Sequence, residues 1–95
     1  MNGFVLLIAA PVLEESLFRA GLHEALLRQG VADWLANGLT ATAFGLTHVL
    51  VRGDVAAFAV ALPALAIGLV YSRWRRVRWC IALHATMNAI GLAAA

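Results

Sequence analysis

The chain has 95 residues, of which 63% are hydrophobic and 13% are charged. Soluble domains contain about 45 to 50% apolar residues, so this composition excludes an ordinary soluble domain and indicates a membrane protein. The net charge of +2 comes from arginines alone, and there is no aromatic-basic cluster of the kind that binds single strands, so nucleic acid is not an expected partner. The single cysteine, Cys80, excludes an internal disulfide and a multi-cysteine metal site.

Four apolar blocks follow one another, each close to the length of a transmembrane helix, which needs about 20 residues. Pro11 predicts a kink in the first block, Asp33 is expected to cap the second or to lie at the membrane interface, and residues 51–54 are typical of a turn. We therefore expect one domain over residues 1–95, an all-α polytopic transmembrane bundle of about four helices. The blocks cover residues 3–28, 33–50, 55–72 and 79–95.

Arginines in the connections predict how the helices are oriented, because cytoplasmic loops of membrane proteins carry an excess of positive charge. The first connection carries Arg28 and the second only Arg52, whereas the third, residues 72–79, carries four arginines. This count places the first and third connections in the cytoplasm. Both termini and the turn at 51–54 are then expected on the far side of the membrane.

Ionisable side chains interrupt the apolar blocks, and such groups are costly in a bilayer unless they are paired or functional. Glu15 and Arg19 are four residues apart on one helix face, so we expect an ion pair with a structural role. Glu14 lies about 100° around the helix from Glu15 and has no local cation. Such a carboxylate is suited to accept or donate a proton; a second packing charge is the alternative.

Two further pairs at four-residue spacing lie on other blocks: Phe44 with His48, and His84 with Asn88. A histidine and an amide side by side can donate two hydrogen bonds to one oxyanion. A carboxylate and a second histidine, such as Glu14 and His48, can deprotonate a water molecule. Together these groups suffice for attack of water on a carbonyl, although polar contacts between helices can also serve packing alone.

Three motifs in this order resemble those of the CPBP intramembrane proteases, the CAAX-protease and bacteriocin-processing enzymes also called the Abi family. EESLFR at 14–19, FGLTH at 44–48 and HATMN at 84–88 are similar to the family motifs EExxxR, FxxxH and HxxxN. The resemblance covers nearly the whole chain and implies the four-helix core of the CPBP fold. Because family members carry further helices around this core, we expect the chain to be a compact or truncated core.

The resemblance implies an intramembrane endopeptidase of the glutamic type. Glu14 and His48 would activate water, and His84 with Asn88 would stabilise the oxyanion. Three residues are expected to support them: Glu15, Arg19 and Phe44. No cofactor is expected; the alternative is a zinc-dependent enzyme with Glu14, His48 and His84 as ligands, which would leave no obvious separate base.

The expected substrate is a membrane-embedded or membrane-anchored protein or peptide, and the expected location is the bacterial inner (plasma) membrane. The resemblance extends to small members that clip a membrane-anchored tail from exported proteins, which suits a chain this short. A non-catalytic immunity or binding protein of the same fold is the alternative function, and a small proton-coupled transporter is a third hypothesis. No pattern in the sequence specifies the cleavage site or the oligomeric state.

Overall fold

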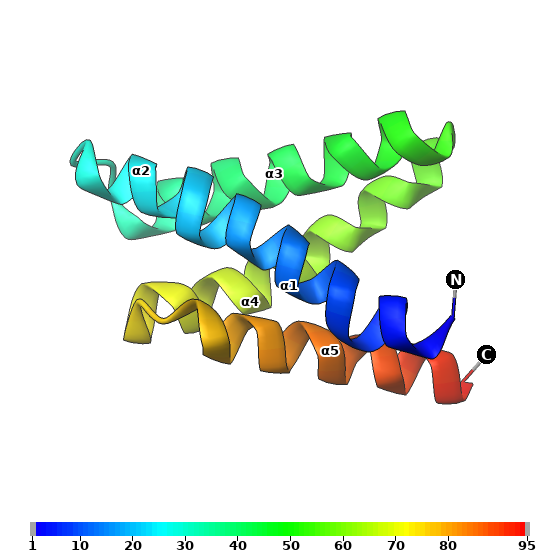
Figure 1. Cartoon of the computed structure of the whole chain (residues 1–95). Helices are drawn as coiled ribbons and strands as arrows, with labels where there is room; N and C mark the ends of the chain where they lie inside the picture. The colour runs from blue at the N-terminus through cyan, green and yellow to red at the C-terminus, as the bar shows by residue number, and fades with distance from the viewer. Residues whose placement is uncertain (1, 95) are drawn as a thin grey trace.

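The computed structural model describes residues 2–94, and all regular structure in that range is helical (Figure 1). Four helices follow one another, which confirms the all-α prediction. The first is continuous but changes its winding, and the third begins with a 3₁₀ segment. The first helix comprises η1 (Val5–Ala9), α1 (Ala10–Glu15), η2 (Ser16–His23) and α2 (Glu24–Arg28); the second is α3 (Asp33–Arg52), the third η3 (Val55–Val60) and α4 (Ala61–Trp74), and the fourth α5 (Val77–Ala94).

The connection between the third and fourth helices is shorter than predicted. α4 continues to Trp74 and α5 begins at Val77, so only Arg75 and Arg76 lie between them. Arg75 has a positive φ of 54° and its N–H donates to the Tyr71 carbonyl, which ends α4 in a single residue. The other predicted loop arginines therefore extend from helix ends.

The predicted turn at 51–54 is also shorter, because α3 continues to Arg52. Gly53 has a positive φ of 68°, a conformation that glycine adopts without steric cost. The Asp54 carboxylate then accepts a hydrogen bond from the Ala56 N–H at 2.9 Å and caps the third helix. Two residues thus end one helix and begin the next, which holds the second and third helices close together.

Asp33 does not cap the second helix, contrary to one of the two roles predicted for it. Ala32 is the N-cap and makes no side-chain hydrogen bond, whereas Asp33 is the first residue of α3. Its carboxylate lies in the first turn, where the positive end of the helix dipole favours a negative charge. An aspartate before an apolar run is typical of both positions, so the sequence pattern did not distinguish them.

Pro11 lies within the first helix and does not end it. The π-type turns of η1 end at Ala9, and ordinary α turns begin at Ala10 with Pro11 in the first turn of α1. Because proline has no N–H to donate, the winding can change here at little cost in backbone hydrogen bonds. A second π-type segment, η2, follows Glu15; wide turns of this kind often occur at functional sites.

The four helices form a bundle with two distinct ends (Figure 1). α3 packs along η3 and α4, and α5 packs against α4 and the first helix. η1, the turn at Gly53 and the end of α5 lie at one end of the bundle, whereas the connections from α2 to α3 and from α4 to α5 lie at the other (Figure 1). The two connections predicted to be cytoplasmic are therefore on the same side.

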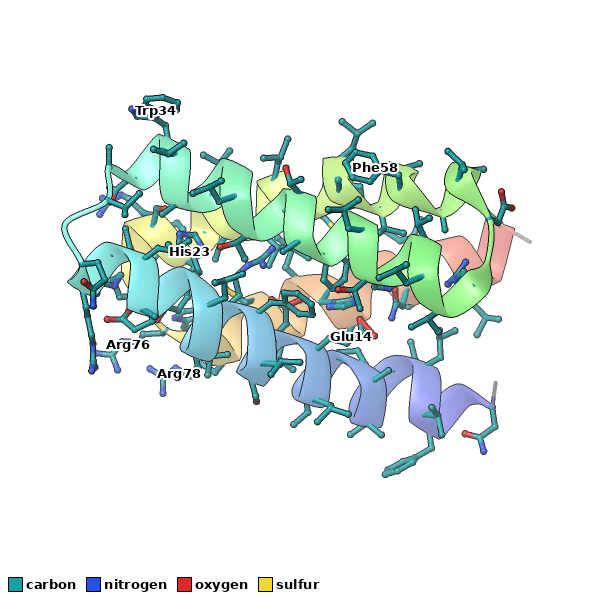
Figure 2. All side chains as sticks on the ribbon, turned by 90° about the horizontal axis from the view of Figure 1, so that it is seen from above. Glu14, His23, Trp34, Phe58, Arg76 and Arg78 are labelled. Carbon is teal, nitrogen blue, oxygen red and sulfur yellow. The ribbon has the colours of Figure 1, made fainter. Side chains whose placement is uncertain are left out.

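Charged and polar side chains fill much of the interior, whereas large apolar side chains cover the outside. Glu15, Arg19 and His23, spaced by four residues along the first helix, are all 0% exposed. Leu50 and Leu62, by contrast, are 83% and 71% exposed. Figure 2 shows His23 between the helices. A soluble protein rarely exposes so much apolar surface, so this distribution suits a lipid environment.

Within residues 2–94, one helix is long and apolar enough to cross a membrane by length and composition, and it is Val55–Trp74. The first helix carries Glu14, Glu15 and Arg19, and α5 carries His84 and Asn88. These polar residues reduce the hydropathy of the helices that bear them. The polytopic arrangement therefore stays a prediction.

Candidate active site

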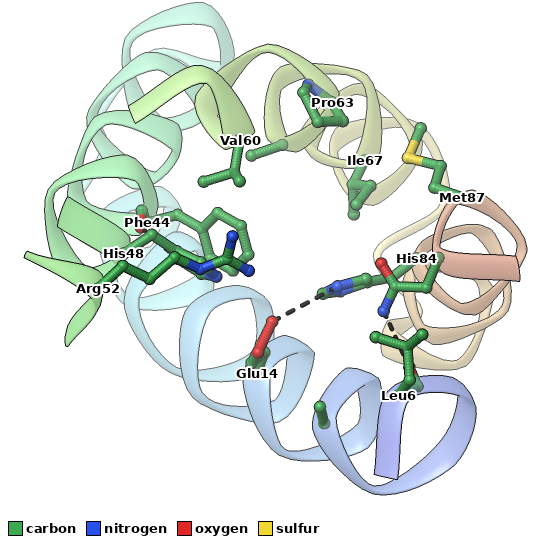
Figure 3. Close-up of a pocket in the computed structure, with 13 residues that line it drawn as sticks. Leu6, Glu14, Phe44, His48, Arg52, Val60, Pro63, Ile67, His84 and Met87 are labelled. Carbon is green, nitrogen blue, oxygen red and sulfur yellow. Dashed lines mark hydrogen bonds and ion pairs between the residues drawn. The ribbon is translucent and has the colours of Figure 1, made fainter. Parts of the chain in front are cut away.

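The four residues predicted to be catalytic line one cavity of about 130 Å³ (Figure 3). α1 contributes Glu14, α3 contributes His48, and α5 contributes His84 and Asn88. Simple counting along each helix puts His48 and His84 at different depths in a membrane, yet both side chains reach this cavity. Its volume accommodates several water molecules.

One wall of the cavity is apolar. Val60 and Pro63 come from the third helix, together with Ile67, and Met87 comes from α5 (Figure 3). The polar residues of α1 and α3 lie across the cavity from this wall. A ligand in the cavity would therefore contact hydrocarbon on one side and ionisable groups on the other.

His84 lies between the two adjacent glutamates. Its Nδ1–H donates a hydrogen bond to Glu15 Oε2 at 2.6 Å, and its Nε2 lies 3.4 Å from Glu14 Oε1. Glu15 is fully buried, but 28% of the Glu14 side chain is exposed. Glu14 is thus the glutamate that a molecule in the cavity can reach. The prediction paired Glu14 with His48, whereas its nearest histidine is His84.

The predicted ion pair of Glu15 and Arg19 is present and fully buried. Arg19 Nε lies 3.5 Å from Glu15 Oε1, and Arg19 Nη2 donates a hydrogen bond to the Ala64 carbonyl at 2.7 Å. Arg19 therefore joins the first helix to α4. Through Glu15, the same chain of contacts reaches His84 and holds its ring in one orientation.

Phe44 and the helix backbone orient His48. The His48 Nδ1–H donates to the Phe44 carbonyl at 2.8 Å, and because a carbonyl can only accept, the proton of the neutral ring belongs on Nδ1. The Nε2 lone pair is then free to accept a proton. The Phe44 ring lies 4.4 Å from the His48 ring and 6.0 Å from the His84 ring, centroid to centroid, so it packs beside both histidines.

Asn88 holds the start of the first helix against α5. Its Nδ2 donates a hydrogen bond to the Leu6 carbonyl at 2.9 Å (Figure 3). An amide nitrogen carries two hydrogens, so one remains for a molecule in the cavity. His84 and Asn88, the pair predicted from their spacing on the fourth helix, thus share the cavity, although each residue also makes a structural contact.

The chain matches the family model of type II CAAX prenyl endopeptidase Rce1-like proteins over residues 1–90. It belongs to the Rce1-like CAAX protease family. No curated protein and no solved structure matched the chain. The match confirms the resemblance to the CPBP proteases, and since Rce1-like proteins are membrane-embedded proteases, the chain is a membrane protein of a protease family.

The residues of this Rce1-like chain do not fit a three-ligand zinc site as they are arranged. Glu14, His48 and His84 line the same cavity, but within residues 2–94 no three His, Cys, Asp or Glu side chains are grouped so that they could hold a metal ion. Nδ1 of each histidine is engaged, with the Phe44 carbonyl and with Glu15. Nε2 is therefore the nitrogen of each ring that remains to bind a ligand or a proton.

Arg52 also lines the cavity, although the sequence pattern predicted that it lies in a turn. α3 extends far enough to include it, at four residues from His48 and eight from Phe44. That spacing was the available signal, because residues at four-residue intervals share a helix face. It was missed because Gly53 and Asp54 made the whole of 51–54 look like a turn.

Proposed function

We propose that this Rce1-like chain is an intramembrane endopeptidase that hydrolyses a peptide bond of a membrane-associated protein or peptide. The observation that carries the proposal is the single cavity shared by Glu14, His48, His84 and Asn88. Three helices supply these groups, and the apolar outside of the bundle suits burial in lipid as a polytopic protein. A shared cavity is what hydrolysis requires, because water and the carbonyl carbon must meet within reach of base and donors.

In the proposed reaction, Glu14 and His48 position and deprotonate a water molecule. The His48 Nε2 lone pair or the Glu14 carboxylate takes the proton as the water oxygen forms a bond to the carbonyl carbon. The resulting tetrahedral intermediate collapses with cleavage of the carbon–nitrogen bond. The proton then passes to the leaving amine, so the base returns to its starting state. The enzyme is of the glutamic type in this scheme.

His84 and Asn88 stabilise the oxyanion of that intermediate. The free hydrogen on Asn88 Nδ2 and a proton on His84 Nε2 are the two donors. Glu15 accepts from His84 Nδ1 at 2.6 Å, so donation from Nε2 requires a proton on both nitrogens of the ring. Glu14, at 3.4 Å from that nitrogen, exchanges this contact for water when a substrate enters.

Replacing the proposed base groups tests the mechanism. We expect Glu14→Gln or His48→Ala to lower cleavage by roughly 10²- to 10⁴-fold, the usual contribution of acid–base catalysis, in protein that stays folded. Asp33→Asn removes an exposed carboxylate at the other end of α3 and serves as the matched control. The measurement is mass spectrometry of fragments from a prenylated CAAX peptide and from a panel of membrane-anchored C-terminal tails, in liposomes.

Cleavage by Glu14→Gln at the wild-type rate would exclude the mechanism. The same assay with a chelator tests the zinc alternative, in which activity would be lost and then restored by zinc. Without a cofactor, as we propose, the chelator leaves the rate unchanged. Immunity or peptide binding that survives both substitutions would instead support the non-catalytic function.

We further propose that the substrates are membrane-anchored tails of exported proteins in the bacterial inner (plasma) membrane. The family description names CAAX prenyl substrates, so the two kinds of peptide in the assay distinguish the subtypes. The apolar wall of the cavity suits the hydrophobic residues of such a tail. The lipid bilayer itself is the other partner.

A further inference from the structure

Arg52 places a positive charge on the rim of the proposed active site. It follows Phe44 and His48 at four-residue intervals on α3, and its side chain lines the same cavity as Glu14 (Figure 3). It is the last residue of α3, directly before Gly53, and it is exposed. The cation therefore lies at an opening of the cavity and not in the core of the bundle.

No carboxylate of residues 2–94 forms an ion pair with Arg52. The same holds for Arg73, Arg76 and Arg78, whereas Arg19 pairs with Glu15, and Arg28 and Arg75 pair with Glu24. Of the four unpaired arginines in this range, Arg52 is the one that lines the cavity. Glu14, which lines the same cavity, contacts His84. The Arg52 guanidinium thus keeps its donors available, and a planar fork of five N–H groups matches a carboxylate in two parallel hydrogen bonds.

The apolar wall of the cavity indicates what kind of molecule would carry the carboxylate that binds Arg52. Val60, Pro63, Ile67 and Met87 form an apolar wall, so a ligand would pack an apolar portion there while presenting its charge to Arg52. A peptide whose apolar side chains lie near a carboxylate has this character. His48, one helical turn before Arg52, then faces a peptide bond a short distance from the charge.

We infer that Arg52 binds a carboxylate of the substrate and thereby determines which peptide bond meets Glu14 and His48. The inference rests on the proposed function and adds a specificity-determining residue to it. The carboxylate has two possible sources, the C-terminus of the substrate or an aspartate or glutamate side chain. Both present the same group to the guanidinium, so the experiment separates them.

The test measures binding without turnover, in the whole 95-residue chain carrying Glu14→Gln, in phosphatidylcholine nanodiscs. The probe is an N-palmitoylated, fluorescein-labelled heptapeptide of leucine, alanine and serine, made as the C-terminal acid, as the C-terminal amide, and as an amide with a final aspartate. We expect at least one carboxylate form to bind about tenfold more tightly than the plain amide, the effect of a charge-assisted hydrogen bond. Adding Arg52→Gln should abolish that difference, whereas Arg52→Lys should keep part of it.

Arg76→Gln is the matched control, because it removes an exposed arginine at the other end of the bundle (Figure 2) and should leave the difference intact. Preference for the acid identifies the C-terminal carboxylate, and preference for the final aspartate identifies a side chain. Equal binding of the three peptides, or an Arg52→Gln effect that is the same for all three, overturns the inference. A charge preference in a protein that cleaves nothing would refute the proposed function and keep only the binding of a carboxylate by Arg52. Cleavage without a preference would refute the inference and keep the proposed function.

Discussion

Adjacent glutamates of the first helix have different environments. Glu15 is fully buried and contacts both Arg19 and His84, whereas part of Glu14 remains exposed to the cavity. The separation follows from helix geometry, because neighbouring residues point about 100° apart. One glutamate can therefore hold the interior together while the other meets a ligand. Arg52 was not among the site residues predicted from the sequence, because its neighbours in the sequence resemble a turn.

The same substitution at both glutamates should separate their roles. Glu15→Gln leaves the buried Arg19 without its carboxylate, and breaking a buried ion pair costs roughly 3 to 5 kcal/mol, so we expect a clearly lower unfolding midpoint in detergent. Glu14→Gln should change that midpoint much less, because its side chain is partly exposed and its contact with His84 Nε2 is long, at 3.4 Å. Equal midpoints for the two variants would contradict this division.

At the scale of elements, two helices approach closely where a glycine faces an amide. Asn37 on α3 donates a hydrogen bond from Nδ2 to the Leu65 carbonyl at 3.0 Å, and its side chain occupies the space where a Cβ on Gly68 would lie. Small residues allow helices in membranes to approach in this way. This contact fixes α3 against α4 and hence His48 opposite the apolar wall.

Gly68→Ala should therefore displace Asn37 and break its hydrogen bond, with a loss of about 1 to 3 kcal/mol. Gly38→Ala, also on a helix, is the control, because a Cβ added there would meet nothing within 4 Å; helix propensity predicts a neutral effect or a gain of up to about 1 kcal/mol. Circular dichroism during thermal unfolding in detergent measures both. Equal stability of the two variants would show that the close contact is dispensable.

At the scale of the whole molecule, the cavity is displaced toward one end of the bundle. The first and second helices contribute residues near one end, Leu6 to Glu14 and Phe44 to Arg52, whereas the third and fourth contribute residues around their middles, Val60 to Ile67 and His84 to Asn88. That end of the bundle contains η1, the Gly53 turn and the end of α5 (Figure 1). The connections with Arg28, Arg75 and Arg76 lie at the opposite end. If arginines mark the cytoplasmic side, the cavity lies toward the other side of the membrane.

Reporter fusions in a bacterial inner membrane test this orientation. We expect alkaline phosphatase to be active and green fluorescent protein to be dark when each is fused after residue 95, because that end lies away from the arginines. Fusions truncated at residue 76 should show the opposite pattern. A fluorescent fusion after residue 95 would place the cavity toward the cytoplasm and refute the exported-substrate subtype.

Features that depend on local spacing could be predicted from the amino-acid sequence. Four apolar blocks predicted four helices, and four-residue intervals predicted the contact of Glu15 with Arg19 and of Phe44 with His48. Helix boundaries were less certain, because a turn and a helix end use the same residues, as at Gly53. Within one helix, the backbone geometry alone decides which side chains meet.

Contacts between helices could not be predicted from the sequence and were found only in the folded bundle. Glu15 meets His84, Asn88 meets Leu6, and Arg52 reaches the cavity. Each of these depends on how far one helix is rotated and shifted along its neighbour, and packing of the whole bundle sets both quantities. Motif order could predict that Glu14, His48 and His84 belong together, but not which histidine lies nearest Glu14.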